Sequence, residues 1–196
     1  GDYKVFIDSS LEPGSLSYGE LVIPGETKEE VFLTSYICHP SLANNECSGP
    51  AVLTFIAKWL LGRNNKYTYR IVFAPETIGA VVYINKNYDK LKENVIAGFN
   101  LTCIGDDRQY SYRPSRLGNT LVDKVVDYVF ENYTESHIKY SFLEKGSDER
   151  QYCHPTVDLP LVSIMRSKYG TYPEYHTSLD NLDLVTPTGL TGGFNM

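Results

Sequence analysis

The four cysteines of this 196-residue chain include no CxxC pair. They lie far apart, at Cys38, Cys47, Cys103 and Cys153. The chain is long enough for one domain with a sizeable hydrophobic core, so it does not need disulfides for stability. The spacing therefore argues against a disulfide framework and predicts four reduced thiols in a cytoplasmic protein.

The chain also has no basic run or stripe, and its formal net charge is −6. We therefore expect no nucleic-acid partner for this domain. No apolar stretch approaches the roughly 20 residues of a transmembrane helix, so we expect no membrane partner. What is present is an ordinary globular composition, with 42% apolar and 21% charged residues, together with 16 tyrosines. Most of these tyrosines are expected at half-buried strand positions.

Apolar runs typical of buried strands alternate along the sequence with stretches of helical periodicity. The predicted strands are 31–38, 69–74, 95–104 and 159–165, with weaker candidates at 5–7, 19–24 and 138–143. The predicted helices are 48–61, 80–91, 121–133 and one that starts at 187, whereas 146–155 is expected to be a polar loop. The alternation predicts an α/β fold, a three-layer α/β/α sandwich with a mostly parallel central sheet.

The expected α/β domain spans residues 31–196. Residues 1–30 contain the turn signals Pro13-Gly14 and Pro24-Gly25 and show little periodicity. We expect them to form an irregular N-terminal segment, such as the end of a preceding or inserted domain.

Chemically versatile side chains follow several predicted strands. His39 and Glu76 come directly after strands, Asp106 and Asp107 follow the next strand, and His176 follows the last strand after a loop. Such positions gather at the carboxyl edge of an open α/β sheet, where ligands bind. Each alone has a simpler explanation, such as a structural histidine or a carboxylate at a helix N-terminus. Their joint placement favours a site.

Four motifs together, HPSLANNECSG, PETIG, GSDERQ and YHTSLDNLD, resemble the zinc-dependent aminopeptidase family, whose fold glutaminyl cyclases share. More narrowly, they resemble aminopeptidase-like domains within larger bacterial proteins of poorly defined function. The resemblance spans residues 31–184. It implies that His39 is the first zinc ligand, Glu76 the general base and His176 the last zinc ligand.

Three positions depart from the family's two-metal pattern. Where the family has carboxylate ligands, this chain has Asn45, Thr77 and Thr102. Amide and hydroxyl groups are poor zinc ligands compared with carboxylates, so we expect at most one zinc ion. Glu46, next to the lost bridging position, is then the predicted oxygen ligand beside His39 and His176. A metal-free site is the competing interpretation.

Other residues are expected to support this site. Asp148, with Arg150 and Tyr175, is predicted to bind substrate, with Asp148 on the rim receiving an amine. An ion pair of Asp148 with Arg150 or Arg166 is the alternative. Behind the ligands we expect two supporting residues, Asn45 and Asp180; Asp180 would either orient His176 or fix its loop through turn hydrogen bonds.

Three functions remain open at this point. The first is a single-zinc aminopeptidase-like hydrolase acting on a small amine-bearing or peptide substrate. The second is a binding or scaffold domain that keeps the fold and has lost hydrolysis. The third is a glutaminyl-cyclase-like acyltransferase, which shares the fold and a single zinc. Four polar groups at one predicted edge favour the first, and the missing carboxylates favour the second.

Overall fold

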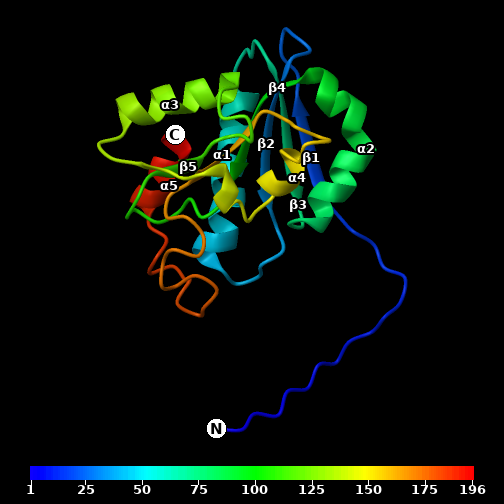
Figure 1. Ribbon diagram of the computed structural model, residues 1–196, viewed down its shortest axis with the longest axis vertical. Coiled ribbons are helices and arrows are strands. Elements are labelled where there is room, and N and C mark those ends of the chain that lie inside the picture. The colour runs from blue at the N-terminus through cyan, green and yellow to red at the C-terminus, as the bar shows by residue number, and fades with distance from the viewer.

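A seven-stranded mixed sheet forms the centre of the protein, described over residues 1–196 in a computed structural model (Figure 1). The strand order is β1-β3-β2-β4-β7-β5-β6. Four of the six pairings are parallel, and only β1 with β3 and β5 with β7 run antiparallel. The strands are β1 (Gly19–Ile23), β2 (Glu30–Tyr36), β3 (Thr68–Ala74), β4 (Val95–Leu101), β5 (Ser111–Arg113), β6 (Ile138–Lys139) and β7 (Leu161–Met165).

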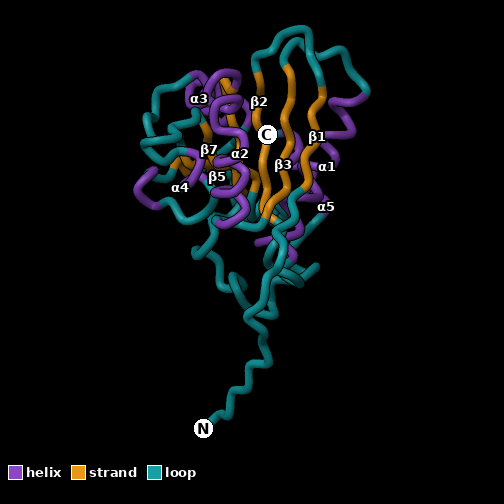
Figure 2. The backbone as a smooth tube through the Cα atoms, turned by 90° about the vertical axis from the view of Figure 1, so that its right-hand side faces the viewer, coloured by secondary structure: helices purple, strands orange, loops and turns teal.

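Helices cover both faces of this sheet, as the two views show (Figures 1 and 2). The helices are α1 (Ser48–Leu61), α2 (Ile78–Asn94), α3 (Leu121–Tyr133), α4 (Glu149–Tyr152) and α5 (Pro187–Asn195). A core of 16 buried residues joins α1 and α3 to one face, and a second core of 13 buried residues joins α2 and α4 to the other. The predicted three-layer sandwich with a mostly parallel sheet is confirmed.

Helix α1 begins and ends where the sequence predicts, and one glycine sets its position. A Cβ atom on Gly49 would lie 2.3 Å from Ser35 Oγ and 2.6 Å from the carbonyl oxygen of Leu101. No other residue fits there, so the first turn of α1 packs directly on β2 and on the end of β4. This contact holds the preceding loop, residues 39–47, at the carboxyl edge of the sheet.

The expected strand at 5–7 is wrong. Residues 1–18 contain no helix or strand, and Figures 1 and 2 show them extending away from the body of the protein. Val5, Phe6 and Ile7 are at least 78% exposed because no neighbouring strand covers them. An apolar run needs a partner strand to satisfy its backbone groups. Residues 19–23, by contrast, form β1 and pair with β3.

The expectation of a polar loop over 146–155 is also wrong. This segment contains α4, and Ser147, Asp148 and Glu149 in it are each only 1% exposed. The sequence contains no local sign of this burial, because the only cationic partner of Glu149, Arg113, comes from a distant segment, as does Ser163. Arg113 itself lies in β5, a three-residue strand too short for its pattern to be recognised.

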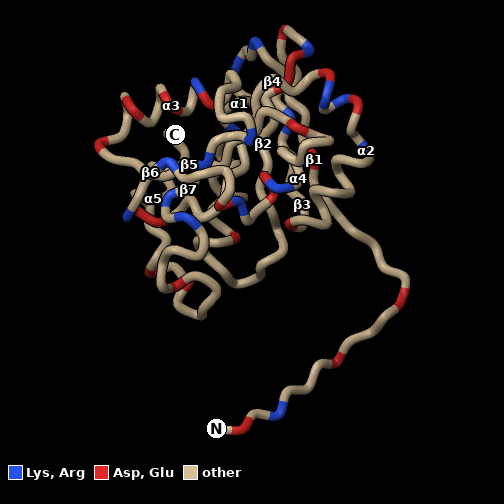
Figure 3. Tube along the Cα trace, in the orientation of Figure 1, with Lys and Arg blue, Asp and Glu red and all other residues tan.

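Several other expectations can be compared directly with the structure. All four cysteines are free thiols. No helix has both the length and the apolar character needed to cross a membrane. Basic and acidic residues are interspersed along the trace in Figure 3.

Candidate functional site

The candidate site lies where β2 and β3 end. These strands are parallel neighbours, and Tyr36 at the end of β2 pairs with Ala74 at the end of β3. The chain then leads to His39 on one side and Glu76 on the other. His39 Nε2 lies 3.8 Å from Glu76 Oε2, and their side chains are 23% and 20% exposed. Both groups are therefore accessible to a small ligand.

Glu46 hydrogen-bonds to the Nδ1 side of the His39 ring, the side opposite to Glu76. Its Oε2 accepts hydrogen bonds from the backbone N–H of His39 at 2.9 Å and from Nδ1 at 3.2 Å. Glu46 belongs to a π-helical turn, residues 43–47, that leads into α1. Burial raises the pKa of Glu46, an effect that the hydrogen bonds and charge of His39 oppose. His39 thus has one carboxylate at each ring nitrogen.

Cys38 also belongs to this cluster. The sequence did not predict its membership. Its sulfur lies 3.3 Å from His39 Nδ1 and accepts a hydrogen bond from the backbone N–H of Glu76 at 3.1 Å. Burial raises the pKa of the Cys38 thiol, Glu46 and Glu76 raise it further, and the N–H of Glu76 opposes them. The donor atoms of Cys38, His39 and Glu46 all lie within 4.8 Å of one another. The only signal in the sequence is that Cys38 precedes His39.

His176 reaches the site from the long loop after β7. Its ring centroid lies 5.7 Å from that of His39, and the ring of Tyr175 stacks on it at 3.9 Å. Asp180 anchors this loop, since its carboxylate accepts the backbone N–H groups of Asn44 at 2.6 Å and Asn45 at 3.0 Å. These contacts join the His176 loop to residues 44 and 45, and both roles expected for Asp180 stay predictions.

The side chains at the three positions that depart from the family's two-metal pattern form hydrogen bonds with other groups of the protein. Asn45 donates from Nδ2 to the Tyr36 hydroxyl at 2.6 Å, and Thr102 Oγ1 shares a hydrogen bond with the same hydroxyl. The buried Oδ1 of Asn45 has no partner. Asp106, another residue considered for the site, is fully buried and binds Asn44 and Ser167. These positions therefore offer no carboxylate for a second metal ion, and one group of donor atoms, Cys38, His39 and Glu46, is close enough to hold a single ion.

Thr77 has a strained backbone beside the proposed base. Its φ of 63° and ψ of −70°, together with the 2.7 Å hydrogen bond from Ile78 N to Glu76 O, define a rare γ-turn. Non-glycine residues with positive φ cost free energy and occur preferentially at functional sites. Ser41, Cys103 and His176 share this feature, so four of the five such residues lie in or beside the site.

Asp148 and Arg150 hold this turn. Asp148 Oδ1 accepts the Thr77 N–H at 2.7 Å, and Arg150 donates to Thr77 Oγ1 at 3.0 Å. Asp148 is 1% exposed, so its expected place on the rim is wrong. Neither Arg150 nor Arg166 forms an ion pair with it: Arg150 binds Thr77, and Arg166 stacks on Tyr110. Burial raises the pKa of Asp148 to about 7, and Glu76 contributes to the rise.

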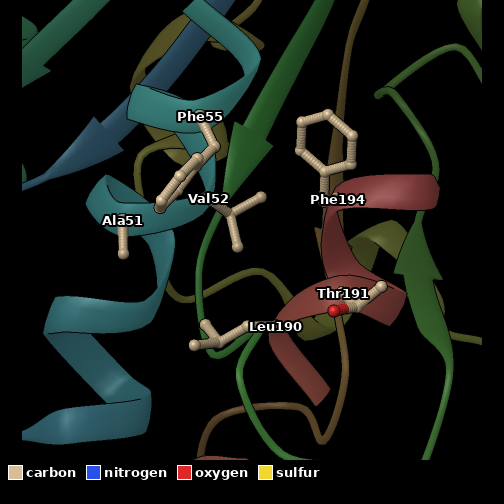
Figure 4. A pocket seen from close by; sticks show the side chains of 6 residues that line it. All are labelled: Ala51, Val52, Phe55, Leu190, Thr191 and Phe194. Atoms are coloured by element: carbon tan, nitrogen blue, oxygen red, sulfur yellow. The ribbon is translucent and has the colours of Figure 1, made fainter. Parts of the chain in front are cut away.

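An apolar groove of 260 Å³ lies elsewhere, between α1 and α5 (Figure 4). Its lining residues are Ala51, Val52, Phe55, Leu190, Thr191 and Phe194. None of them carries an ionisable group, so this groove lacks the means for acid–base or metal chemistry.

Comparison with known proteins gives the family. A model of the family described as "Domain of unknown function (DUF4910)" matches residues 4–196. The chain belongs to this family. It is also 47% identical over 193 residues to a protein of Clostridium acetobutylicum described as a candidate polysaccharide biosynthesis protein with an aminopeptidase-like domain. The match covers 98% of this chain and 44% of that protein, so the chain spans less than half of its relative's length.

Solved structures agree on the fold. A crystal structure of a candidate peptidase from Clostridium acetobutylicum has a TM-score of 0.87 at 44% identity, covering 90% of this chain and 42% of the other. A zinc aminopeptidase from Bacillus subtilis has a TM-score of 0.73 at 16% identity, covering 91% and 47%. A glutaminyl cyclase from Porphyromonas gingivalis has a TM-score of 0.72 at 16% identity, covering 92% and 74%. This DUF4910 domain therefore has the aminopeptidase fold.

Proposed function

We propose that this domain is a single-metal, aminopeptidase-like hydrolase that acts on a small amine-bearing or peptide substrate. The observation that carries the proposal is the environment of His39 at the carboxyl edge of the sheet. One carboxylate, Glu46, binds its Nδ1 side, and a second, Glu76, faces its Nε2 side. Zinc aminopeptidases of the same fold support the choice of metal and reaction class.

The residues of the cluster have separable roles in this proposal. His39 and Glu46 would hold zinc, a Lewis acid that polarises carbonyl groups and acidifies water. Glu76, partly exposed and held by the strained turn at Thr77, is the proposed general base and takes the proton of the attacking water at Oε2. His176, the third ligand implied by the family resemblance, lies across the His39 ring.

Substrate binding is proposed on the side of His176. Tyr175 stacks on His176 and is half-buried, so its ring can form an apolar wall beside the metal. Asp148 and Arg150 lie behind Thr77 and are proposed to act on the substrate through the position of Glu76. Asp148 would still attract a cationic amine when it is ionised.

Replacement of Glu76 by Gln tests the proposed base. The substitution keeps the size of the side chain and removes its ability to accept a proton. We expect kcat/KM on a panel of aminoacyl anilides to fall by about 10²–10⁴-fold, with zinc content unchanged. Glu93→Gln, an exposed change on α2, is the matched control. Equal activity of both variants would contradict the role of Glu76.

A binding domain without hydrolysis is the second candidate, supported by the neutral Asn45, Thr77 and Thr102 at the family's carboxylate positions. Metal analysis of protein purified without chelator separates the two, because only the hydrolase requires zinc. A peptide with an N-terminal glutamine in the same panel tests the glutaminyl-cyclase-like alternative.

A further inference from the structure

The compact set of donor atoms in this site differs from the set that the family resemblance implies. It contains Cys38, His39 and Glu46, and it does not contain His176. His176 is exposed, and its ring centroid is 5.7 Å from that of His39. A third donor is already present on the Glu46 side of the ring, without any movement of the His176 loop.

Two spacings within this set match those of zinc ligands, and the third, between Cys38 and Glu46, is at most 4.8 Å. The His39 Nδ1 atom lies 3.3 Å from Cys38 Sγ and 3.2 Å from Glu46 Oε2. Bond lengths of about 2.3 Å to sulfur and 2.0–2.2 Å to nitrogen or oxygen put tetrahedral ligands roughly 3.3–3.6 Å apart. Sulfur, nitrogen and oxygen are each established zinc donors in proteins.

The position of the sulfur is fixed by two segments that are distant in sequence. The backbone N–H of Glu76, from the end of β3, donates to Cys38 Sγ. A short loop that leaves β2 presents Cys38 and His39 together, while the π-helical turn presents Glu46. Glu46 is 7% exposed, so a cation bound there would neutralise a largely buried carboxylate.

We propose that Cys38 is a zinc ligand. Cys38, Nδ1 of His39, and Glu46 would together be the three protein ligands of a zinc site. This proposal rests on the zinc binding by His39 and Glu46 in the proposed function, and it identifies Cys38 as the third protein ligand. When zinc binds, the Cys38 S–H bond would break and its proton would pass to solvent, while the Nδ1 proton of His39 would move through solvent to Nε2, so that sulfur and Nδ1 would each present a lone pair to the metal. Three protein ligands leave a fourth position open, the arrangement of catalytic zinc sites.

Cobalt titration of the purified protein tests the proposal, because cobalt occupies zinc sites and a thiolate ligand gives a near-ultraviolet charge-transfer band. Wild type, Cys47→Ser and His176→Ala should each bind one cobalt ion with this band. Cys38→Ser should lose the band and bind zinc at least about tenfold more weakly. Cys47 is the matched control, since it is also an exposed free thiol. Retention of the band in Cys38→Ser, or its loss in His176→Ala alone, would overturn the assignment.

Alkylation of the wild-type protein gives a second test that needs no variant. Saturating zinc should slow iodoacetamide modification of Cys38 by about tenfold and leave that of Cys47 nearly unchanged. If cobalt binds without the band and zinc does not protect Cys38, the proposal for Cys38 is wrong and the single-metal hydrolase stands. If the wild-type protein binds neither metal, both the cysteine ligand and the metal part of the proposed function are wrong.

Discussion

Asp148 and Glu149 are adjacent carboxylates, each 1% exposed, yet their pKa values shift in opposite directions. Burial raises the pKa of Asp148 to about 7, because only the Thr77 N–H and the more distant Arg150 oppose it. Burial acts on Glu149 as well, but the charge of Arg113 and the N–H groups of Ser147 and Gly146 outweigh it and lower the pKa.

The two carboxylates belong to different regions of the protein. Glu149 is the centre of what we call the Glu149 network, which comprises Arg113, Gly146, Ser147, Ser163 and Tyr169. Asp148 faces the His39 cluster, which comprises Cys38, His39, Glu46 and Glu76. The network pairs the charge of Glu149 with that of Arg113, whereas the cluster has three carboxylates in or near it and no lysine or arginine bonded to them. The first region stabilises the fold, and the second has the charge to attract a cation or an amine.

The largest expected effect comes from breaking the network. Glu149→Gln leaves the guanidinium of Arg113 buried without its carboxylate partner, which should lower the free energy of unfolding by about 3–5 kcal/mol. Urea denaturation at pH 7 measures the change, and Glu131→Gln on the exposed side of α3 is the control. A loss similar to that of the control would show that the network contributes little to stability.

A smaller effect, on zinc affinity, is expected from a substitution in the His39 cluster. Glu46→Gln removes the negative charge next to His39 Nδ1, so zinc affinity should fall by about 10–100-fold. Competition with a chromogenic chelator measures this, and the exposed change Glu29→Gln is the control. Unchanged affinity would mean that zinc binds outside the cluster or not at all.

The pH dependence of stability should distinguish the two carboxylates. Asp148 has a pKa of about 7 in the folded state and roughly 3.9 in the unfolded state. The folded state therefore binds more protons between these values, and the stability of the wild type should fall as pH rises from about 4 to about 7. Asp148→Asn removes this loss, so relative to wild type it should raise the free energy of unfolding by about 4 kcal/mol more at pH 8 than at pH 4.

Glu149 should give the free energy of unfolding the opposite dependence on pH. Because its pKa is lowered in the folded state, Glu149 stabilises the fold at pH values above its unfolded pKa, and this contribution is lost as pH falls. Thermal unfolding from pH 8 down to about pH 3 measures both, since the Glu149 contribution is lost only below its unfolded pKa of about 4.3; the exposed change Asp89→Asn is the control. The same pH slope in Asp148→Asn and in wild type would show that Asp148 is ionised at neutral pH.

The smallest effect is expected at an ion pair outside both regions. Lys139 binds Asp127 at 2.7 Å, with both side chains at least one-third exposed. Lys139→Met should change the free energy of unfolding by about 0.5 kcal/mol or less, because water screens such pairs. A loss as large as that of Glu149→Gln would remove the distinction between buried and exposed pairs.

The carboxyl-edge placement of His39 and Glu76 could be predicted from the sequence, because each follows a recognisable strand. The membership of Cys38 could not, because its contact with Glu76 joins residues 38 positions apart. The burial of Asp148 depends on Thr77, 71 positions away. Local patterns contain no information about such contacts. The functional roles of these residues stay predictions until the experiments above are done.

The sequence by itself determined the elements that local periodicity controls: α1 and α3 begin and end where predicted, and the four main strands are present. Hydrogen bonds between nearby residues and the spacing of apolar side chains are sufficient for this. Tertiary structure decided that 5–7 is not a strand, that Ser147, Asp148 and Glu149 are buried and that adjacent carboxylates differ in pKa. Each of these depends on which distant groups supply a strand partner, a cation or a hydrogen-bond donor, and only the folded chain brings those groups together.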